Sequence, residues 1–346
     1  MKTEWKKFLE NAGAIFEDGK VANFGNPVRE LRVITTGTVI ADLSHWGLIA
    51  AHGEDTNAFL QGQFSNDIRE ISATQSQLSS YCSAKGRVLA IMRVFQHGNS
   101  VYLNVPRDIL EDTIKRLRMY VLRSKVTLED MSESFVRIGL SGPNAAIQLQ
   151  EAVGQLPESI NGVLQLKDMT IIHIPGPHPR YEIIGDLDPM QKLWSRLDVH
   201  AAPIGANPWN LLDILAGIPS VHKETMDAFV PQMLNLQAIG GVNFKKGCYP
   251  GQEIVARMQY LGKLKRRMYL AHVDSDLAPK PGDAIFSEDT DTEQSAGKVV
   301  NAQATPDGGY HLLAVALITG AEHNNLHLHN ANGPKLQLMQ LPYKVE

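Results

Sequence analysis

The hydrophobic pattern of this chain changes at about residue 268, and this change restricts the fold more than any other feature. Before it, strand-like and helix-like runs alternate. After it, short apolar runs are interrupted by Pro-Gly-Asp (281–283), Pro-Asp-Gly-Gly (306–309) and Asn-Gly (332–333). Such punctuation is typical of a small all-β barrel. We therefore expect an α+β body followed by a C-terminal β-barrel, residues 268–346, with an acidic solvated rim over residues 274–293.

The body has a similar order of elements in two stretches, residues 1–130 and 131–205. The periodicity predicts helices over 1–16, 55–63, 107–120, 143–153, 189–197 and 209–217, and strands over 31–51, 79–95, 101–105, 135–141, 169–174 and 181–184. Alternation of this kind favours two related α+β units. Residues 206–267 then form a connecting segment.

A cationic stretch, residues 244–267, lies in the connecting segment and reads FKKGCYPGQEIVARMQYLGKLKRR. Its seven Lys or Arg and single Glu give it a net charge of +6, whereas the whole chain has a formal net charge of −4. Cys248 follows Lys245 and Lys246 after a single glycine and lies between Gly247 and Gly251, which allow tight turns. Neighbouring lysines favour the thiolate, which is the nucleophilic and metal-binding form of cysteine.

These residues alone leave several roles open. Most charged runs are solvated, and most isolated cysteines are small buried hydrophobes, so Cys248 is as consistent with a structural role as with reactivity. The run Lys263–Arg267 could bind nucleic-acid phosphates, the polyglutamate tail of a folate or an acidic protein. One short run on an acidic chain gives little support for direct nucleic-acid binding.

Composition excludes several classes of protein. The two cysteines, Cys82 and Cys248, are too few for a disulfide framework and for the four thiolates that normally hold an iron–sulfur cluster. The histidines of the C-terminal region lack the spacing typical of zinc sites, so we expect no bound metal. No apolar run approaches the roughly 18 residues of a membrane span, and no signal peptide is apparent. We expect a cytoplasmic protein without a membrane partner.

The motif K-x-G-C-Y-x-G-Q-E, here Lys245–Glu253, resembles the signature of the YgfZ family of folate-binding, iron–sulfur-cluster-maintenance proteins. The resemblance also covers residues 42–46, 59–63, 84–86, 229–241 and 341–343. That family is similar in fold to the glycine cleavage T-protein, an aminomethyltransferase. The resemblance therefore implies a T-protein-like α+β fold with two related units and a C-terminal β-barrel.

The resemblance also implies a folate site and a thiol site. Trp46 and Trp209 occupy motif positions associated with tetrahydrofolate or a one-carbon derivative of it, although packing in the core is the alternative for both indoles. Cys248 is the expected catalytic thiol. The expected motif-loop residues are Lys245, Lys246, Gly247, Tyr249, Gly251, Gln252 and Glu253, with Arg257 as a supporting cation.

Two departures from the T-protein pattern bear on the chemistry. The acidic pair that the T-protein uses with its aminomethyl group is replaced by Ala90 and Ile91, which leaves no obvious proton acceptor. The acid expected near the pterin is replaced by Leu215, and Asp213 is turned away from that direction by about 160° on a helix. We therefore expect no ordinary aminomethyl transfer and an altered folate site.

The leading hypothesis is a tetrahydrofolate-binding accessory protein for assembly or repair of iron–sulfur clusters in client enzymes. Its partners would be iron–sulfur enzymes or assembly proteins, and its effect on tRNA modification would be indirect. One alternative is a folate-dependent one-carbon transferase with an altered substrate. Another is a scaffold in which Cys248 is incidental and Lys265–Arg267 carries the binding.

Overall fold

The computed structural model describes residues 1–287 and 295–345, and the chain divides into two compact units. Unit 1 contains residues 1–56, 69–77 and 93–212. Unit 2 contains residues 57–68, 78–92 and 213–346. The chain therefore passes from one unit to the other after residues 56, 68, 77, 92 and 212, and neither unit is a continuous stretch.

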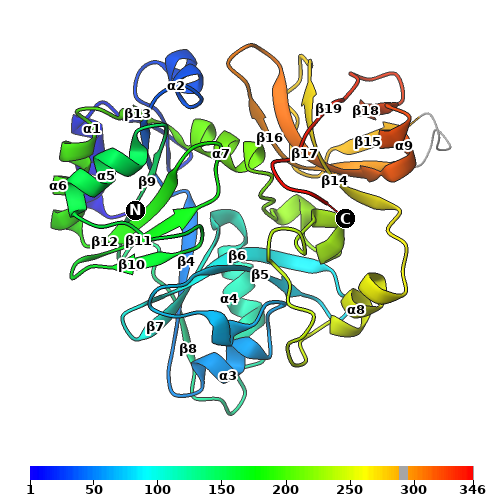
Figure 1. The fold of residues 1–346 in the computed structure, drawn as a ribbon, viewed down its shortest axis with the longest axis horizontal. Coiled ribbons are helices and arrows are strands. Elements are labelled where there is room, and N and C mark those ends of the chain that lie inside the picture. Colours follow the sequence, from blue (N-terminus) through cyan, green and yellow to red (C-terminus); the bar gives the residue numbers. More distant parts are fainter. Residues whose placement is uncertain (288–294, 346) are drawn as a thin grey trace. The chain divides into compact units, whose positions relative to one another are not determined.

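Helices and strands alternate through the first two thirds of the chain, and strands dominate the remainder (Figure 1). The helices are α1 Thr3–Asn11, α2 Pro27–Val33, α3 Thr56–Gln61, α4 Leu110–Arg118, α5 Ala145–Val153, α6 Leu187–Leu197, α7 Ala206–Leu215, α8 Gln252–Tyr260 and α9 Ile318–Glu322, with 3-10 turns η1 Ile68–Glu70, η2 Arg107–Ile109, η3 Lys223–Thr225 and η4 Pro231–Leu234. The strands are β1 Ile15–Glu17, β2 Lys20–Asn23, β3 Val39–Asp42, β4 Trp46–His52, β5 Gln77–Cys82, β6 Val88–His97, β7 Ser100–Pro106, β8 Thr127–Asp130, β9 Val136–Ser141, β10 Val163–Gln165, β11 Met169–Ile174, β12 Arg180–Gly185, β13 Ala202–Ile204, β14 Arg266–Val273, β15 Ala284–Ser287, β16 Gly297–Ala304, β17 Tyr310–Leu317, β18 Leu326–Leu328 and β19 Gln337–Met339.

Unit 1 is built on a six-stranded sheet with the order β10-β11-β12-β9-β3-β13. Its neighbours pair antiparallel except β13, which runs parallel to β3. Helix α6 packs on β9 and β12 and also contacts α1 and α5 (Figure 1). The shared core includes Trp5 and Trp194, whose rings meet edge to face at 5.6 Å. Burial of two indoles supplies a large apolar area to this core.

A five-stranded sheet has the order β5-β6-β7-β4-β8, and the division between the compact units passes through β5 and β6. Strand β6 is the longest strand, and its first eight residues, 88–95, are buried. These residues are apolar except for Arg93, as is typical of a strand covered on both faces.

The C-terminal part of unit 2 is a curled antiparallel sheet, a half-barrel, with the order β18-β15-β16-β17-β14-β19 (orange to red in Figure 1). Residues 334–336, directly before β19, form backbone hydrogen bonds to the edge strand β18. The predicted C-terminal β region is therefore confirmed, as a half-barrel that also contains the short helix α9. The predicted acidic rim extends into residues 288–294, which lie outside the described residues.

The prediction of strand structure from residue 31 onward is wrong at its start, because Leu31 and Val33 lie in α2. Asn26 caps this helix by accepting a hydrogen bond from the Arg29 amide at 3.0 Å, and Pro27 begins it. The Glu30 carboxylate is buried and accepts hydrogen bonds from the Phe24 and Gly205 amides. A helix capped in this way outweighs the strand-like run of apolar residues.

The predicted ranges 1–130, 131–205, 206–267 and 268–346 stay predictions, and they are not coextensive with the compact units. Strand β3, from the first range, pairs with β9 from the second. Helix α1 likewise contacts α6. The predicted helix over residues 1–16 ends at Asn11, so that Phe16 belongs to β1.

Candidate functional site: an exposed thiol and a tryptophan corner

The Cys248 loop lies in unit 2 and leads directly into α8. Cys248 is an exposed free thiol. Gly251 precedes the first residue of α8 in a left-handed conformation, with φ 77°. The Gln252 side-chain amide lies 3.4 Å from the carbonyl oxygens of Lys246 and Gly247 and donates to them weakly. The first residue of α8 thus contacts the two residues that precede the exposed Cys248.

Lys246 fixes the loop from beneath. Its ammonium donates hydrogen bonds to the carbonyl oxygens of Gln61, at 2.6 Å, and Phe64, and its side chain is only 6% exposed. These carbonyls belong to the C-terminal end of α3 and the turn after it, where backbone acceptors lack intrahelical donors. The ammonium also lies 5.1 Å from the centre of the Tyr249 ring. Lys246 therefore acts as a clamp, whereas the adjacent Lys245 is exposed.

Tyr249 and Cys82 form the buried side of this region. Burial raises the pKa of the Tyr249 hydroxyl, and the neighbouring Cys82 adds to the effect. Burial also raises the pKa of the Cys82 thiol to about 12, against a weaker opposing effect of its contact with Ser80. Cys82 is therefore held as a neutral thiol, which agrees with a structural role. The accessible sulfur is that of Cys248.

Two glycines allow α8 to approach the turn after β5. A Cβ atom on Gly251 would lie 2.4 Å from the Ser83 carbonyl oxygen and 2.5 Å from the Gly86 Cα atom. A Cβ atom on Gly86 would lie 2.8 Å from that of Ile254. Both glycines also have positive φ, which other residues adopt only at a cost. The close approach fixes the point at which the Cys248 loop ends and α8 begins.

Replacing Gly251 with alanine is expected to lower the free energy of unfolding by about 2 to 3 kcal/mol, because the new methyl group meets backbone atoms and the left-handed conformation becomes strained. Urea unfolding followed by tryptophan fluorescence measures this change. Gly247→Ala is the matched control, since no atom lies within 4 Å of its Cβ position. Equal stabilities of the two variants would contradict this account.

Trp46 and Trp209 both lie in unit 1, with different exposures. Trp46 is half-buried at the start of β4. Trp209 is 1% exposed, and the Arg180 guanidinium lies 4.2 Å from the centre of its ring. A Cβ atom on Gly139 would fall 2.3 Å from the same indole. Trp209 is therefore a core residue in this structure, and of the two tryptophans only Trp46 is partly exposed.

A buried polar network holds Trp46, and the sequence did not reveal it. Asp42, which is 1% exposed, accepts hydrogen bonds from Trp5 Nε1 at 2.8 Å and from the Ser44 hydroxyl at 2.8 Å. Burial raises the pKa of Asp42, and these hydrogen bonds and Arg137 oppose the rise. Arg137 is also buried and donates a hydrogen bond to the Trp46 carbonyl oxygen. Burial lowers the pKa of Arg137 to about 10. The network thus fixes the backbone from which the Trp46 indole projects.

His45, beside Trp46, gives unit 1 a pH-dependent stability. Its Nε2 lies 3.0 Å from Asn210 Oδ1, and burial lowers its pKa to about 4. Since an unfolded histidine titrates near pH 6.5, the unfolded chain binds the proton more readily between these values. The stability that His45 contributes is therefore complete above about pH 6.5 and is lost as the pH falls toward 4.

Between pH 7 and pH 5, the wild-type protein is expected to lose about 2 kcal/mol more unfolding free energy than His45→Gln. The glutamine variant keeps a hydrogen-bonding group but cannot titrate. Denaturant midpoints at the two pH values measure the difference. Parallel pH dependences in the two proteins would show that His45 is not the responsible group.

The three positions that depart from the T-protein pattern, Ala90, Ile91 and Leu215, have apolar side chains in the structure. Ala90 and Ile91 lie in β6 as buried apolar residues. Leu215 ends α7 and is half-buried. These three places therefore offer neither a proton acceptor nor a hydrogen-bond acceptor for a pterin.

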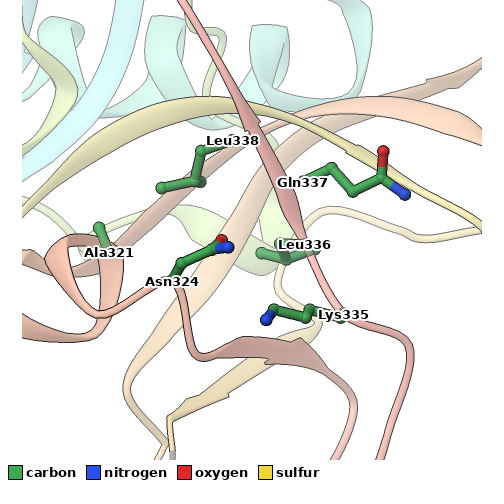
Figure 2. A pocket seen from close by; sticks show the side chains of 6 residues that line it. All are labelled: Ala321, Asn324, Lys335, Leu336, Gln337 and Leu338. Atoms are coloured by element: carbon green, nitrogen blue, oxygen red, sulfur yellow. The ribbon is translucent and has the colours of Figure 1, made fainter.

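A separate pocket of about 520 Å³ lies in the C-terminal sheet (Figure 2). It is lined by Ala321, Asn324, Lys335, Leu336, Gln337 and Leu338. Figure 2 shows Leu338 and Gln337 on opposite sides of β19, as strand alternation requires. None of the predicted site residues lines this pocket, and Lys335 is its single ionisable side chain.

Two further properties bear on the class of site. Across residues 1–287 and 295–345, no group of three or more His, Cys, Asp or Glu side chains is arranged to hold a metal ion. In the same residues no helix combines the length and apolarity needed to cross a bilayer.

Comparisons with known proteins agree with the fold. Residues 15–246 match the family described as the GCVT N-terminal domain. The solved structure of glycine cleavage system aminomethyltransferase T from Bartonella henselae superimposes with a TM-score of 0.80 at 17% identity, covering 99% of this chain and 97% of that one. The chain therefore has the fold of the GCVT class.

Two relatives in sequence identify the family within this class. The protein described as tRNA-modifying protein YgfZ from Colwellia psychrerythraea is 34% identical over 279 residues, covering 80% of this chain and 85% of the relative. A protein of the same description from Photorhabdus laumondii is 31% identical over 312 residues, covering 90% and 94%. The chain belongs to the YgfZ family.

Proposed function

We propose that this protein binds tetrahydrofolate or a one-carbon derivative of it and assists the assembly or repair of iron–sulfur clusters in client enzymes. Through those clients it would affect tRNA modification indirectly. The observation that carries the proposal is the exposed Cys248 thiol on a loop clamped by Lys246, in a chain of the YgfZ family. The relatives named tRNA-modifying protein are consistent with that indirect effect.

Cys248 would act as a transient ligand to iron or sulfur of a cluster that the partner holds. One thiolate is too few to keep a cluster, which normally needs four. Because Cys248 is exposed, its sulfur can reach an atom on another protein. Lys246 and Gly251 already hold the loop, so little conformational freedom is lost when the partner binds. Lys245 and Arg257 are exposed cations of the same stretch.

The folate part of the proposal is supported at one position and weakened at two. The half-buried Trp46, held by Asp42 and Arg137, offers an indole surface for a flat pterin. Trp209 is in the core, and Leu215 is apolar where an acid is expected. We therefore place the folate beside Trp46 and assign no chemical step to it.

Complementation tests the proposal. Cells that lack their own YgfZ protein receive the wild-type chain, Cys248→Ser or Lys280→Met, and the activity of a [4Fe–4S] enzyme is measured under oxidative stress. Wild type and Lys280→Met, at an exposed lysine outside the Cys248 loop, are expected to rescue, whereas Cys248→Ser fails despite equal soluble levels and an unchanged denaturant midpoint. Equal rescue by Cys248→Ser would show that the thiol is dispensable and would favour a scaffold role.

Folate binding is tested on the purified protein by isothermal titration with tetrahydrofolate. Trp46→Ala is expected to weaken binding at least about tenfold, the usual scale for loss of a stacked aromatic contact. Trp46→Phe should retain most of the affinity. Identical affinities of all three proteins would remove the folate from the proposal.

A further inference from the structure

Exposed side chains on the Cys248 loop, on α8 and on the segments next to them are not explained by the thiol chemistry. We call this set the α8 surface, and it consists of Lys85, Lys245, Cys248, Ile254, Arg257, Tyr260, Leu261, Lys263 and Lys265. Three of these are large hydrophobic residues with high exposed fractions: Ile254 38%, Tyr260 68% and Leu261 84%. Apolar side chains gathered beside a functional group mark interaction sites more often than isolated ones do.

The backbone holds these apolar residues at the surface. The amides of Leu261 and Gly262 both donate to the Arg257 carbonyl oxygen at 2.9 Å, which ends α8 with Leu261 outward. The rings of Phe244 and Tyr260 meet at 6.2 Å with an interplanar angle of 68°. This contact joins the two ends of the stretch that contains Cys248. The apolar residues are therefore placed by α8 and the loop together.

The cations of the α8 surface are available for a partner. Among the described residues, the side chains of Lys245, Arg257, Lys263 and Lys265 form no hydrogen bond or ion pair. Arg266 and Arg267 differ, since Arg266 donates to the Ala296 and Ser295 carbonyl oxygens and Arg267 to the Tyr269 hydroxyl at 3.1 Å. The predicted binding run Lys263–Arg267 is thus part binding surface and part structural.

We propose that the α8 surface is the docking site for an acidic protein partner, whose apolar residues cover Tyr260 and Leu261 while its carboxylates meet the surrounding cations. The inference rests on the proposed function, because docking here would bring the partner's cluster to Cys248. Glu253 is the one acid within residues 244–267, so the surface complements negative charge. Interfaces commonly combine an aromatic and aliphatic centre with arginines at their core and a charged rim.

The composition of the surface favours a protein over a nucleic acid. Leu261 and Ile254 offer no flat face for a base, and the edge-to-face arrangement of Phe244 and Tyr260 is not a stacking platform. A second copy of the chain would bring the same cations together, which is unfavourable.

Complementation at native expression tests the docking site with Leu261→Asp and with the pair Lys263→Glu and Lys265→Glu. Both variants are expected to lower rescue of the [4Fe–4S] enzyme at least tenfold while Cys248 keeps its rate of alkylation by iodoacetamide. Because docking follows mass action, about 30-fold overexpression should restore rescue. Overexpression should not restore rescue by Cys248→Ser. The controls are Leu277→Asp, at a leucine that is 70% exposed, and the pair Lys280→Glu and Lys298→Glu.

The remaining outcomes separate this inference from the proposed function. If wild type fails to rescue, both fail together. If wild type rescues and the α8-surface variants rescue equally well at native expression, the docking site alone is overturned. Gel-shift binding of total tRNA that the Lys263→Glu and Lys265→Glu pair abolishes would assign the surface to nucleic acid instead. A concentration-dependent dimer in sedimentation that Leu261→Asp dissociates would assign it to a second copy.

Discussion

Asp42→Ala is expected to lower the free energy of unfolding by about 2 to 4 kcal/mol, because each buried polar group left without its partner costs about 1 to 3 kcal/mol. The Asp42 carboxylate accepts from Trp5 and Ser44 and lies near the buried Arg137. Its removal leaves the Trp5 indole N–H unsatisfied and Arg137 less compensated. Denaturant unfolding at pH 7 measures the change.

Asp42→Asn separates the hydrogen bonds from the charge. Because burial raises the pKa of Asp42, its neutral form is favoured more than in an ordinary aspartate, and the neutral amide should cost less than alanine. The network reaches the Trp46 carbonyl through Arg137, so the alanine variant should also bind tetrahydrofolate more weakly. A loss below 1 kcal/mol for alanine would show that this network is not important for stability.

Lys246→Met is expected to lower the free energy of unfolding by about 2 to 4 kcal/mol and to abolish rescue in the complementation assay. Methionine keeps the apolar stem but leaves the Gln61 and Phe64 carbonyl oxygens without their donor, and each unsatisfied buried group costs about 1 to 3 kcal/mol. The loop then loses its attachment to residues 61–64. Denaturant unfolding and the complementation assay are measured on the same variant.

Lys245→Met is the matched control, because it removes the same charge one residue earlier from an exposed side chain. Its expected effect is within about 0.5 kcal/mol, as for most surface substitutions. Equal effects of the two substitutions would mean that the positive charge of the stretch matters, and not the clamp. If Lys246→Met lowers stability strongly but still gives full rescue, attachment of the loop by Lys246 is not needed for function.

The sequence predicted the elements of unit 1 and the C-terminal sheet well where a strong period coincided with an end signal. The helix predicted over 189–197 is α6, and the strand predicted over 169–174 is β11. The failure at α2 has a clear cause. Asn26 and Pro27 are helix-start signals, but the apolar residues that follow them were interpreted as a strand. Capping residues are better evidence than apolar content in a segment this short.

The site was only partly predictable, because its decisive contacts join residues far apart in the chain. Two adjacent lysines precede Cys248, and nothing local tells that Lys246 turns inward to carbonyls about 180 residues earlier while Lys245 stays exposed. Trp209 and Trp46 likewise look alike in the sequence. Gly139 and Arg180, which hold Trp209 in the core, are brought to it by β9 and β12. The motif therefore located the loop without revealing which side chains support it.

The interrupted course of the chain has a consequence for biosynthesis. Unit 2 combines residues 57–68 and 78–92 with residues 213–346, so the parts of β5 and β6 that belong to it leave the ribosome long before residues 213–346. Until the last third of the chain is synthesised, the apolar residues 88–92 have no complete core to enter. Nascent chains of this protein should therefore depend on chaperones that shield such segments, and shortened chains ending near residue 212 should aggregate although unit 1 is complete in them.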